Sequence, residues 1–190
     1  MSGGKMETTK EALILFLKSL PTGSRFEIIN FGTKFDLMSN SKEGYTYDDK
    51  TLNAVIPMVQ QMTADYGGTD IYRPLKDAIY KISTKLNKKI FLLTDGEVDN
   101  PDSVVKLATE APQDIRIHTF GIGRDCDSSL VRRVASAGRG TCSLVRENKD
   151  LKSQVIIALQ RAQHPSYTGV RLTINEKPKI SGNSFQYNLC

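Results

Sequence analysis

One short segment, residues 89–94 (KIFLLT), constrains the fold of this chain more than any other part of the sequence. It is almost continuously apolar, which is typical of a strand that lies in a parallel sheet and is covered on both faces. Asp95-Gly96 follows directly and favours a turn at the end of that strand. The fold must therefore supply covering layers on both sides of it.

Helical and strand patterns alternate along most of the chain. Apolar spacing predicts helices at residues 5–20, 48–62 (with Asp48 as the cap), 71–86, 102–111, 128–137 and 150–163. Further strands are predicted at residues 25–31, 35–38, 116–120 and 141–145, with His118 in the core or half-buried. This alternation predicts an α/β fold: a doubly wound, mostly parallel sheet with helices on both faces.

The pattern changes after residue 163. Residues 170–174 (VRLTI) look like another strand, and Gly182-Asn183-Ser184 looks like a turn. We therefore expect one α/β domain over residues 1–163, followed by a linker and the start of a further β element over residues 164–190.

Composition excludes several classes of protein. No apolar run approaches the roughly 20 residues of a membrane helix, so we expect no membrane segment. The net charge of +5 is dispersed without an aromatic or Arg-rich block, which favours a solvated face over a nucleic-acid site. The three cysteines form no C-x-x-C pair, which argues against a zinc site or disulfide framework. Free thiols indicate a reducing compartment, and we expect a cytoplasmic location.

Two loops carry candidate ligands. Gly67-Gly68-Thr69-Asp70 opens a predicted helix, and Thr94-Asp95-Gly96 follows the most apolar strand. In parallel sheets, ligands gather at the carboxyl ends of the strands, and hydroxyl and carboxylate oxygens suit a hard cation such as Mg²⁺. Taken singly, a strand-end Asp-Gly turn and a Thr-Asp helix cap favour a purely structural interpretation.

As an ordered set, these segments resemble the von Willebrand factor type A domain. The set comprises the opening helix, residues 25–31 (RFEIINF), 67–71 (GGTDI), 90–96 (IFLLTDG), 118–123 (HTFGIG) and the closing helix. The runs GGTDIYRPL and RAQHPSYTGV are similar to the A domain-containing 5 group and the inter-α-trypsin inhibitor heavy chains. The resemblance implies a Rossmann-like fold over residues 1–163.

The resemblance also implies a metal-ion-dependent adhesion site built by three loops. The family's second loop supplies a Thr and its third an Asp, which correspond to Thr69 and Asp95. The first loop, D-x-S-x-S, has no counterpart here. Met1 falls where that loop's usual run ends, so we expect the first, central strand and the remaining ligands upstream of Met1.

An incomplete ligand set has a physical consequence. Thr69 is neutral, so Asp95 is the single charged ligand that the resemblance assigns. We expect Mg²⁺ or Mn²⁺ in the complete domain, and weak or no binding in this chain.

Two functions from different classes remain open. The first is a non-enzymatic protein-binding module, in which an acidic side chain of the partner protein meets the metal site. The alternative is a nucleotide-binding or metal-dependent hydrolytic α/β domain, suggested by Thr94-Asp95-Gly96. No Gly-rich phosphate loop with a Lys and no nucleophile–base set is visible, so we predict no catalytic or cofactor-binding residues.

Overall fold

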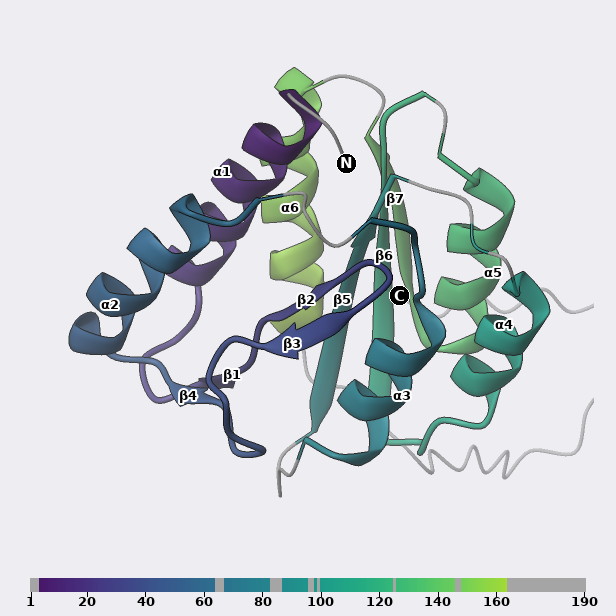
Figure 1. Cartoon of the computed structure of the whole chain (residues 1–190), viewed down its shortest axis with the longest axis horizontal. Coiled ribbons are helices and arrows are strands. Elements are labelled where there is room, and N and C mark those ends of the chain that lie inside the picture. Colours follow the sequence, from purple (N-terminus) through teal and green to yellow (C-terminus); the bar gives the residue numbers. More distant parts are fainter. Residues whose placement is uncertain are drawn as a thin grey trace, which may run out of the picture.

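The computed structural model describes residues 4–63, 67–82, 87–95, 98, 100–124, 126–145 and 148–163 (Figure 1). The helices are α1 (Gly4–Lys18), α2 (Asp49–Gln60), α3 (Tyr72–Tyr80), α4 (Pro101–Thr109), α5 (Ser128–Ala137) and α6 (Asn148–Gln163). The strands are β1 (Arg25–Phe26), β2 (Ile29–Phe31), β3 (Phe35–Leu37), β4 (Tyr45–Thr46), β5 (Lys88–Thr94), β6 (Ile115–Ile122) and β7 (Arg139–Val145).

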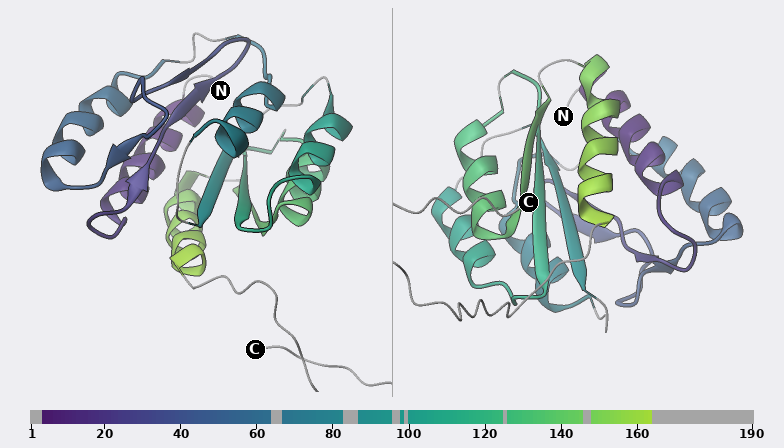
Figure 2. Two further views of the ribbon diagram at one scale, coloured as in Figure 1. Left: turned by 90° about the horizontal axis from the view of Figure 1, so that it is seen from below. Right: turned by 180° about the vertical axis from the view of Figure 1, so that it is seen from behind.

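A parallel sheet of order β5-β6-β7 lies at the centre of the molecule. Helices α3, α4 and α5 cover one face, and α1 and α6 cover the other (Figures 1 and 2). Parallel neighbours need crossover helices, and α4 and α5 supply them. The predicted α/β fold with helices on both faces is confirmed.

Two hydrophobic clusters explain this layering. On β6, Ile117 packs into a cluster with residues of α3, α4 and α5, whereas Phe120 packs with Ala12 of α1 and Val155 of α6. Alternate side chains of a strand point to opposite faces, so one strand anchors both layers. His118 is 6% exposed, as the alternation predicts.

The first part of the chain forms a separate layer around α1 and α2. Strands β1 and β4 pair antiparallel, as do β2 and β3. Their apolar side chains meet those of the two helices in a third cluster, which includes Leu17, Val55 and Val59. Asp48 caps α2 as predicted, accepting a hydrogen bond from the Thr51 N–H at 2.6 Å.

The predicted single strand over residues 25–31 is wrong, because the segment divides between the two hairpins. Phe26 pairs with Tyr45, whereas Ile29 pairs with Leu37. Between them, the Glu27 carboxylate accepts hydrogen bonds from the N–H groups of Ile28 and Ser39. A side chain therefore takes the place of a ladder partner at this point, and the chain changes direction there.

Strand β5 lies at an edge of the parallel sheet. Both of its faces are covered, since Ile90 and Leu92 pack into the α3–α5 cluster and Phe91 and Leu93 into the α1–α6 cluster. Among the described residues, however, its backbone pairs with β6 alone. Most β5 side chains are half-buried.

Helix α3 is shorter than the sequence predicts. Helix α3 ends at Tyr80 rather than near residue 86, because the Lys88 ammonium binds the carbonyls of Ala78, Ile79 and Ile82 at 2.8–2.9 Å.

The strand predicted at residues 170–174 lies outside the described residues. Within the described part of the chain, no helix is both long and apolar enough to cross a membrane.

Candidate metal-binding face and adjoining groove

The loop that carries Thr69 is held by the turn between β2 and β3. The Thr33 N–H donates to the Gly67 carbonyl at 3.1 Å, and the Asp70 N–H donates to the Gly32 carbonyl at 3.0 Å. Gly68 has a φ of 32°, and a Cβ there would lie 2.7 Å from Thr33 Oγ1. Glycine is therefore required for this close approach, which sets the position of Thr69.

Thr69 and Asp95 lie toward the same edge of the sheet. Lys88, at the start of β5, binds the last carbonyls of α3, so α3 runs back along β5 and its first turn lies toward the strand's carboxyl end. Thr69 precedes that turn, and Asp95 directly follows Thr94, the last residue of β5. Both side chains are half-buried.

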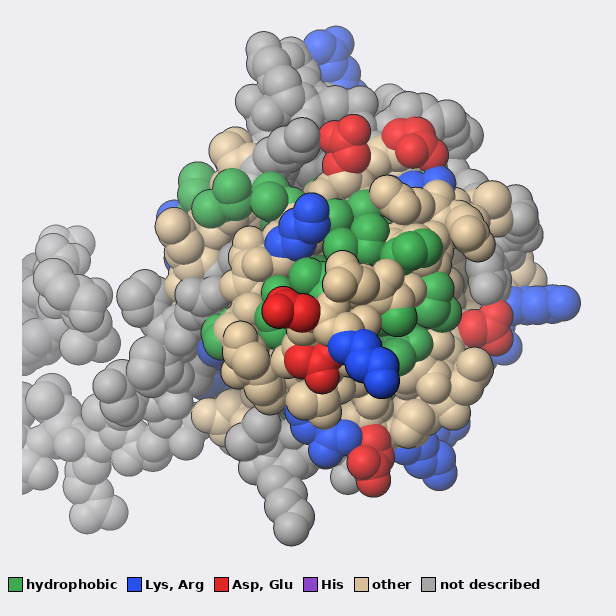
Figure 3. Space-filling view, turned by 90° about the vertical axis from the view of Figure 1, so that its left-hand side faces the viewer, with side chains coloured by type: hydrophobic (Ala, Val, Ile, Leu, Met, Phe, Trp, Pro, Cys, Tyr) green, Lys and Arg blue, Asp and Glu red, His purple; other side chains and the backbone are tan. Residues whose placement is uncertain are grey.

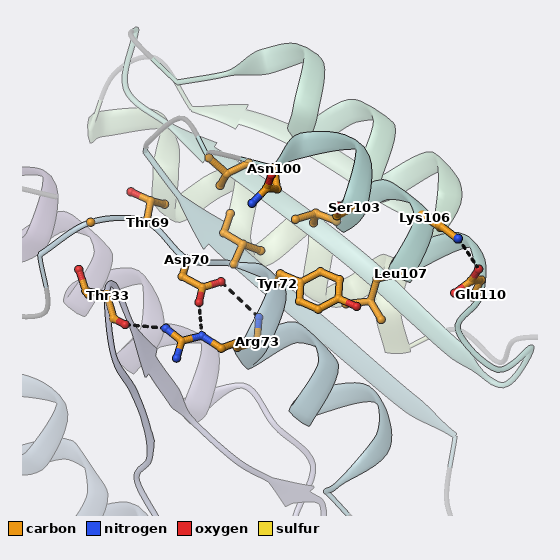
Figure 4. Close-up of a pocket in the computed structure, with 14 residues that line it drawn as sticks. Thr33, Thr69, Asp70, Tyr72, Arg73, Asn100, Ser103, Lys106, Leu107 and Glu110 are labelled. Atoms are coloured by element: carbon orange, nitrogen blue, oxygen red, sulfur yellow. Dashed lines mark hydrogen bonds and ion pairs between the residues drawn. The ribbon is translucent and has the colours of Figure 1, made fainter.

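The neighbouring carboxylate, Asp70, serves a structural purpose. It accepts a hydrogen bond from the Arg73 backbone N–H at 3.3 Å and pairs with the Arg73 guanidinium. That guanidinium also donates to the Thr33 carbonyl at 2.7 Å (Figure 4). Asp70 therefore orients Arg73, and the Arg73 guanidinium connects the start of α3 to the β2–β3 turn.

The described residues do not make a complete site for a hard cation. They offer the Thr69 hydroxyl and the Asp95 carboxylate at this edge, whereas Mg²⁺ demands near-octahedral oxygen coordination. Within the described ranges, no cluster of three or more His, Cys, Asp or Glu side chains is suited to hold a metal ion. These residues alone therefore do not fit a tightly held ion.

A groove with a volume of about 760 Å³ adjoins Thr69, and we call it the α3–α4 groove. It is lined by Thr33, Gly68–Arg73, Val98, Asn100, Ser103, Val104, Lys106, Leu107 and Glu110. Figure 4 shows Thr33 and Thr69 at one end, Tyr72 and Leu107 in the middle, and Lys106 and Glu110 at the other. The volume is within the range of about 300–1,000 Å³ typical of ligand sites.

Sequence reasoning missed the groove. Its α4 side repeats at helical spacing, with Ser103, Lys106 or Leu107, and Glu110 on one face. That spacing also describes any amphipathic surface helix, so it carries no separate signal. The groove exists because α4 packs beside α3, which is a tertiary relation.

Comparisons with known proteins agree with this architecture. Residues 1–144 match the sequence profile of the von Willebrand factor type A domain. Over 174 residues the chain is 31% identical to a von Willebrand factor A domain-containing protein of Dictyostelium discoideum, covering 90% of this chain and 18% of that protein. It is 33% identical to human von Willebrand factor A domain-containing protein 5A, covering 93% of this chain and 22% of that protein. The chain thus spans about a fifth of these relatives.

Solved structures show the same fold. A von Willebrand factor type A structure from Catenulispora acidiphila has a TM-score of 0.73 at 23% identity, covering 81% of this chain and 37% of that one. Proximal thread matrix protein 1 of the mussel byssus, with a zinc-occupied MIDAS motif, has a TM-score of 0.64 at 17% identity, covering 83% and 43%. At these identities, the likeness concerns the fold alone.

Proposed function

Because the chain belongs to the von Willebrand factor type A domain family, we propose that it is a non-enzymatic protein-interaction module. The observation that carries the proposal is the placement of Thr69 and Asp95 toward the carboxyl edge of the parallel sheet, beside an open groove. Ligands of open α/β sheets bind at that edge. A binding face of this kind needs no nucleophile or general base.

The partner that fits this proposal is a protein that presents an acidic side chain to the edge. In this proposal, Thr69 and Asp95 are one part of a metal-ion-dependent adhesion site, and a D-x-S-x-S loop would supply the other ligands. Mg²⁺ or Mn²⁺ is the ion suited to such oxygen ligands. The mussel byssus protein, which shares this fold, has a zinc-occupied MIDAS motif, and this supports the proposal of a divalent ion.

We assign the binding module to residues 1–163 and regard residues 164–190 as a linker that begins a further β element. We place the module in the cytoplasm. Among the described residues, Cys126 and Cys142 are not joined in a disulfide, which fits a reducing compartment.

The first prediction concerns metal affinity. Since the described residues supply an incomplete ligand set, we expect the 190-residue chain to show little Mg²⁺ or Mn²⁺ binding by titration calorimetry. A version extended ahead of Met1 with a strand ending in D-x-S-x-S should bind the ion. In that version, Asp95→Ala should weaken binding by about tenfold or more, because it removes a charged ligand, and Thr69→Ala should weaken it less.

Thermal shift gives the control measurement, because a ligand of the native state raises the melting temperature. Asp36→Ala, an exposed substitution on β3, should leave the metal response of the extended version unchanged. Tight binding of the ion by the 190-residue chain would show that side chains other than Thr69 and Asp95 also serve as metal ligands. A shift with ATP rather than with the metal would favour a nucleotide-binding domain instead.

A further inference from the structure

The Arg73 guanidinium is held in a fixed position at the surface, beside the candidate metal-binding face. Arg73 lies in the first turn of α3, just after the loop that carries Thr69. Its Nε donates to the Asp70 carboxylate, and its Nη2 donates to the Thr33 carbonyl at 2.7 Å (Figure 4). Two elements of the fold therefore hold this side chain, although 57% of it is exposed to solvent.

Part of the guanidinium remains available to a binding partner. Arginine carries five N–H donors in a planar fork, and a carboxylate can accept hydrogen bonds from two of them. Within the ranges that the structure describes, the two N–H groups of Arg73 Nη1 have no acceptor. Because Asp70 and Thr33 already fix the guanidinium, binding a carboxylate there costs little further side-chain entropy.

Two lysines lie on the same elements as this arginine. Lys76 follows Arg73 by about one turn of α3, and its ammonium lies 6.0 Å from the centre of the Tyr72 ring. Lys34 follows Thr33 in the β2–β3 turn and is exposed. Neither ammonium forms an ion pair with a described residue. We call Lys34, Arg73 and Lys76 the basic rim.

The acidic side chains of these elements have partners of their own. Asp70 is bound to Arg73, and Asp77 of α3 pairs with Lys81 at 3.0 Å. Asp36 of β3 also has a partner. The two ammonium groups of the basic rim are therefore left to attract an external anion, and charge complementarity of this kind selects among binding partners.

We infer that the basic rim binds an acidic segment of the partner protein, with one carboxylate on Nη1 of Arg73 and further carboxylates near Lys34 and Lys76. The inference rests on the proposed function, since it takes the partner to be a protein that meets the face of Thr69 and Asp95. It adds a requirement for specificity: the partner carries acidic residues beside the one that meets the metal site.

The test measures the fluorescence anisotropy of labelled hexaglutamate with the 190-residue chain in EDTA, and hexaglutamine serves as the neutral probe. We expect hexaglutamate to bind more tightly, and to weaken as NaCl rises. Arg73→Gln should weaken hexaglutamate binding by about tenfold. Arg73→Lys keeps the charge but loses the planar fork, and Lys76→Gln removes one unpaired ammonium, so each should weaken binding by about threefold.

Arg133→Gln is the matched control. Arg133 is also an exposed arginine in an ion pair with an aspartate, Asp102, but it lies on α5. The substitution removes the same charge, so it should change hexaglutamate affinity by less than about twofold. Melting curves show which variants fold, and if Arg73→Gln does not, Arg73→Lys and Lys76→Gln decide the result.

Three outcomes would overturn the inference. The first is equal binding of hexaglutamate and hexaglutamine. The second is that the substitutions in the basic rim weaken hexaglutamate no more than Arg133→Gln does, which would show that only net charge matters. The third is tighter binding of a six-nucleotide oligodeoxythymidylate than of hexaglutamate, which would indicate a nucleic-acid site.

A metal arm separates this inference from the proposed function. Suppose that the D-x-S-x-S-extended version binds hexaglutamate only with Mg²⁺, and that Asp95→Ala abolishes this binding but Arg73→Gln does not. That result would refute the basic rim and leave the adhesion site standing. Binding in EDTA that depends on Arg73 and Lys76, with no response to Mg²⁺, would support the basic rim and count against the adhesion site.

Discussion

His118 is a titratable side chain that lies buried in the central sheet, 6% exposed. Its Nδ1 accepts a hydrogen bond from the Thr141 N–H at 3.2 Å and lies 2.9 Å from the Thr141 hydroxyl, so the neutral ring carries its proton on Nε2. The ring stacks on Phe91. Burial, and then the charges of Lys89 and Arg116, lower the pKa of His118 to about 4. The folded protein thus holds this histidine neutral.

This pKa makes a prediction about stability and pH. An unfolded histidine has a pKa near 6.5, so between pH 6.5 and 4 the unfolded state binds more protons than the folded state. The contribution of neutral His118 is therefore complete above pH 6.5 and is lost as the pH falls toward 4. From the pKa difference, the loss of unfolding free energy is at most about 3 kcal/mol.

Urea unfolding of the chain and of His118→Gln at several pH values measures this loss. Carboxylates contribute their own pH dependence, so the quantity to compare is the difference between the two proteins. The stability of the variant should fall less steeply between pH 6.5 and 4. Parallel curves for both proteins would mean that His118 titrates alike in the folded and unfolded states.

At the scale of elements, the open edge of β5 has the clearest consequence. On that side β5 has no ladder partner among the described strands, and apolar side chains flank the edge on both faces. An exposed apolar edge is a template for pairing with another chain.

We therefore expect the chain to self-associate. Its weight-average mass in sedimentation experiments should rise with protein concentration and exceed that of a monomer. The version extended with a strand ahead of Met1 should remain monomeric at the same concentrations, because the added strand pairs with the edge. A 190-residue chain that stays monomeric, while unfolding in one sharp transition, would contradict this account of the edge.

At the scale of the whole molecule, α1 joins the early layer to the central sheet. Leu17 is buried among residues of the hairpins and α2, whereas Phe16 meets Phe91 of β5 with ring centroids 4.6 Å apart. Figure 3 views the molecule from the side of this early layer, and apolar side chains lie between charged ones on that face. Helix α1 also packs along α6, so it contacts both halves of the fold.

Substitutions in α1 test this coupling. Phe16→Ala should lower the free energy of unfolding by about 3 kcal/mol, because it removes a large half-buried ring from the contact with Phe91. Leu15→Ala is the control: Leu15 is also half-buried but belongs to none of the three clusters, so its loss should stay below about 1 kcal/mol. Equal losses in the two variants, measured by urea unfolding, would show that α1 does not join the layers through Phe16.

Part of the candidate site could be predicted from the sequence because its signals are local. The sequence predicts two loops from residues that are adjacent in the chain: the turn after the strand that ends in Thr94-Asp95, and the loop formed by the paired glycines before Thr69. The sequence favoured a structural Thr-Asp helix cap here, but it could not predict that the Asp70 carboxylate also pairs with the Arg73 guanidinium. Its partner Arg73 is near in sequence, but the choice between metal ligand and ion pair depends on the distant Thr33 carbonyl, which also holds the guanidinium.

The sequence by itself determined the order of helices and strands, the α/β class and the positions of Thr69 and Asp95, because periodicity and turn chemistry act over a few residues. Only the tertiary structure decided that residues 25–31 divide between two antiparallel pairs of strands and that α3 and α4 enclose a groove. Each of these depends on groups brought together from distant parts of the chain, such as Glu27 with Ser39 or Tyr72 with Leu107. Contacts of that kind leave no periodic trace in the sequence.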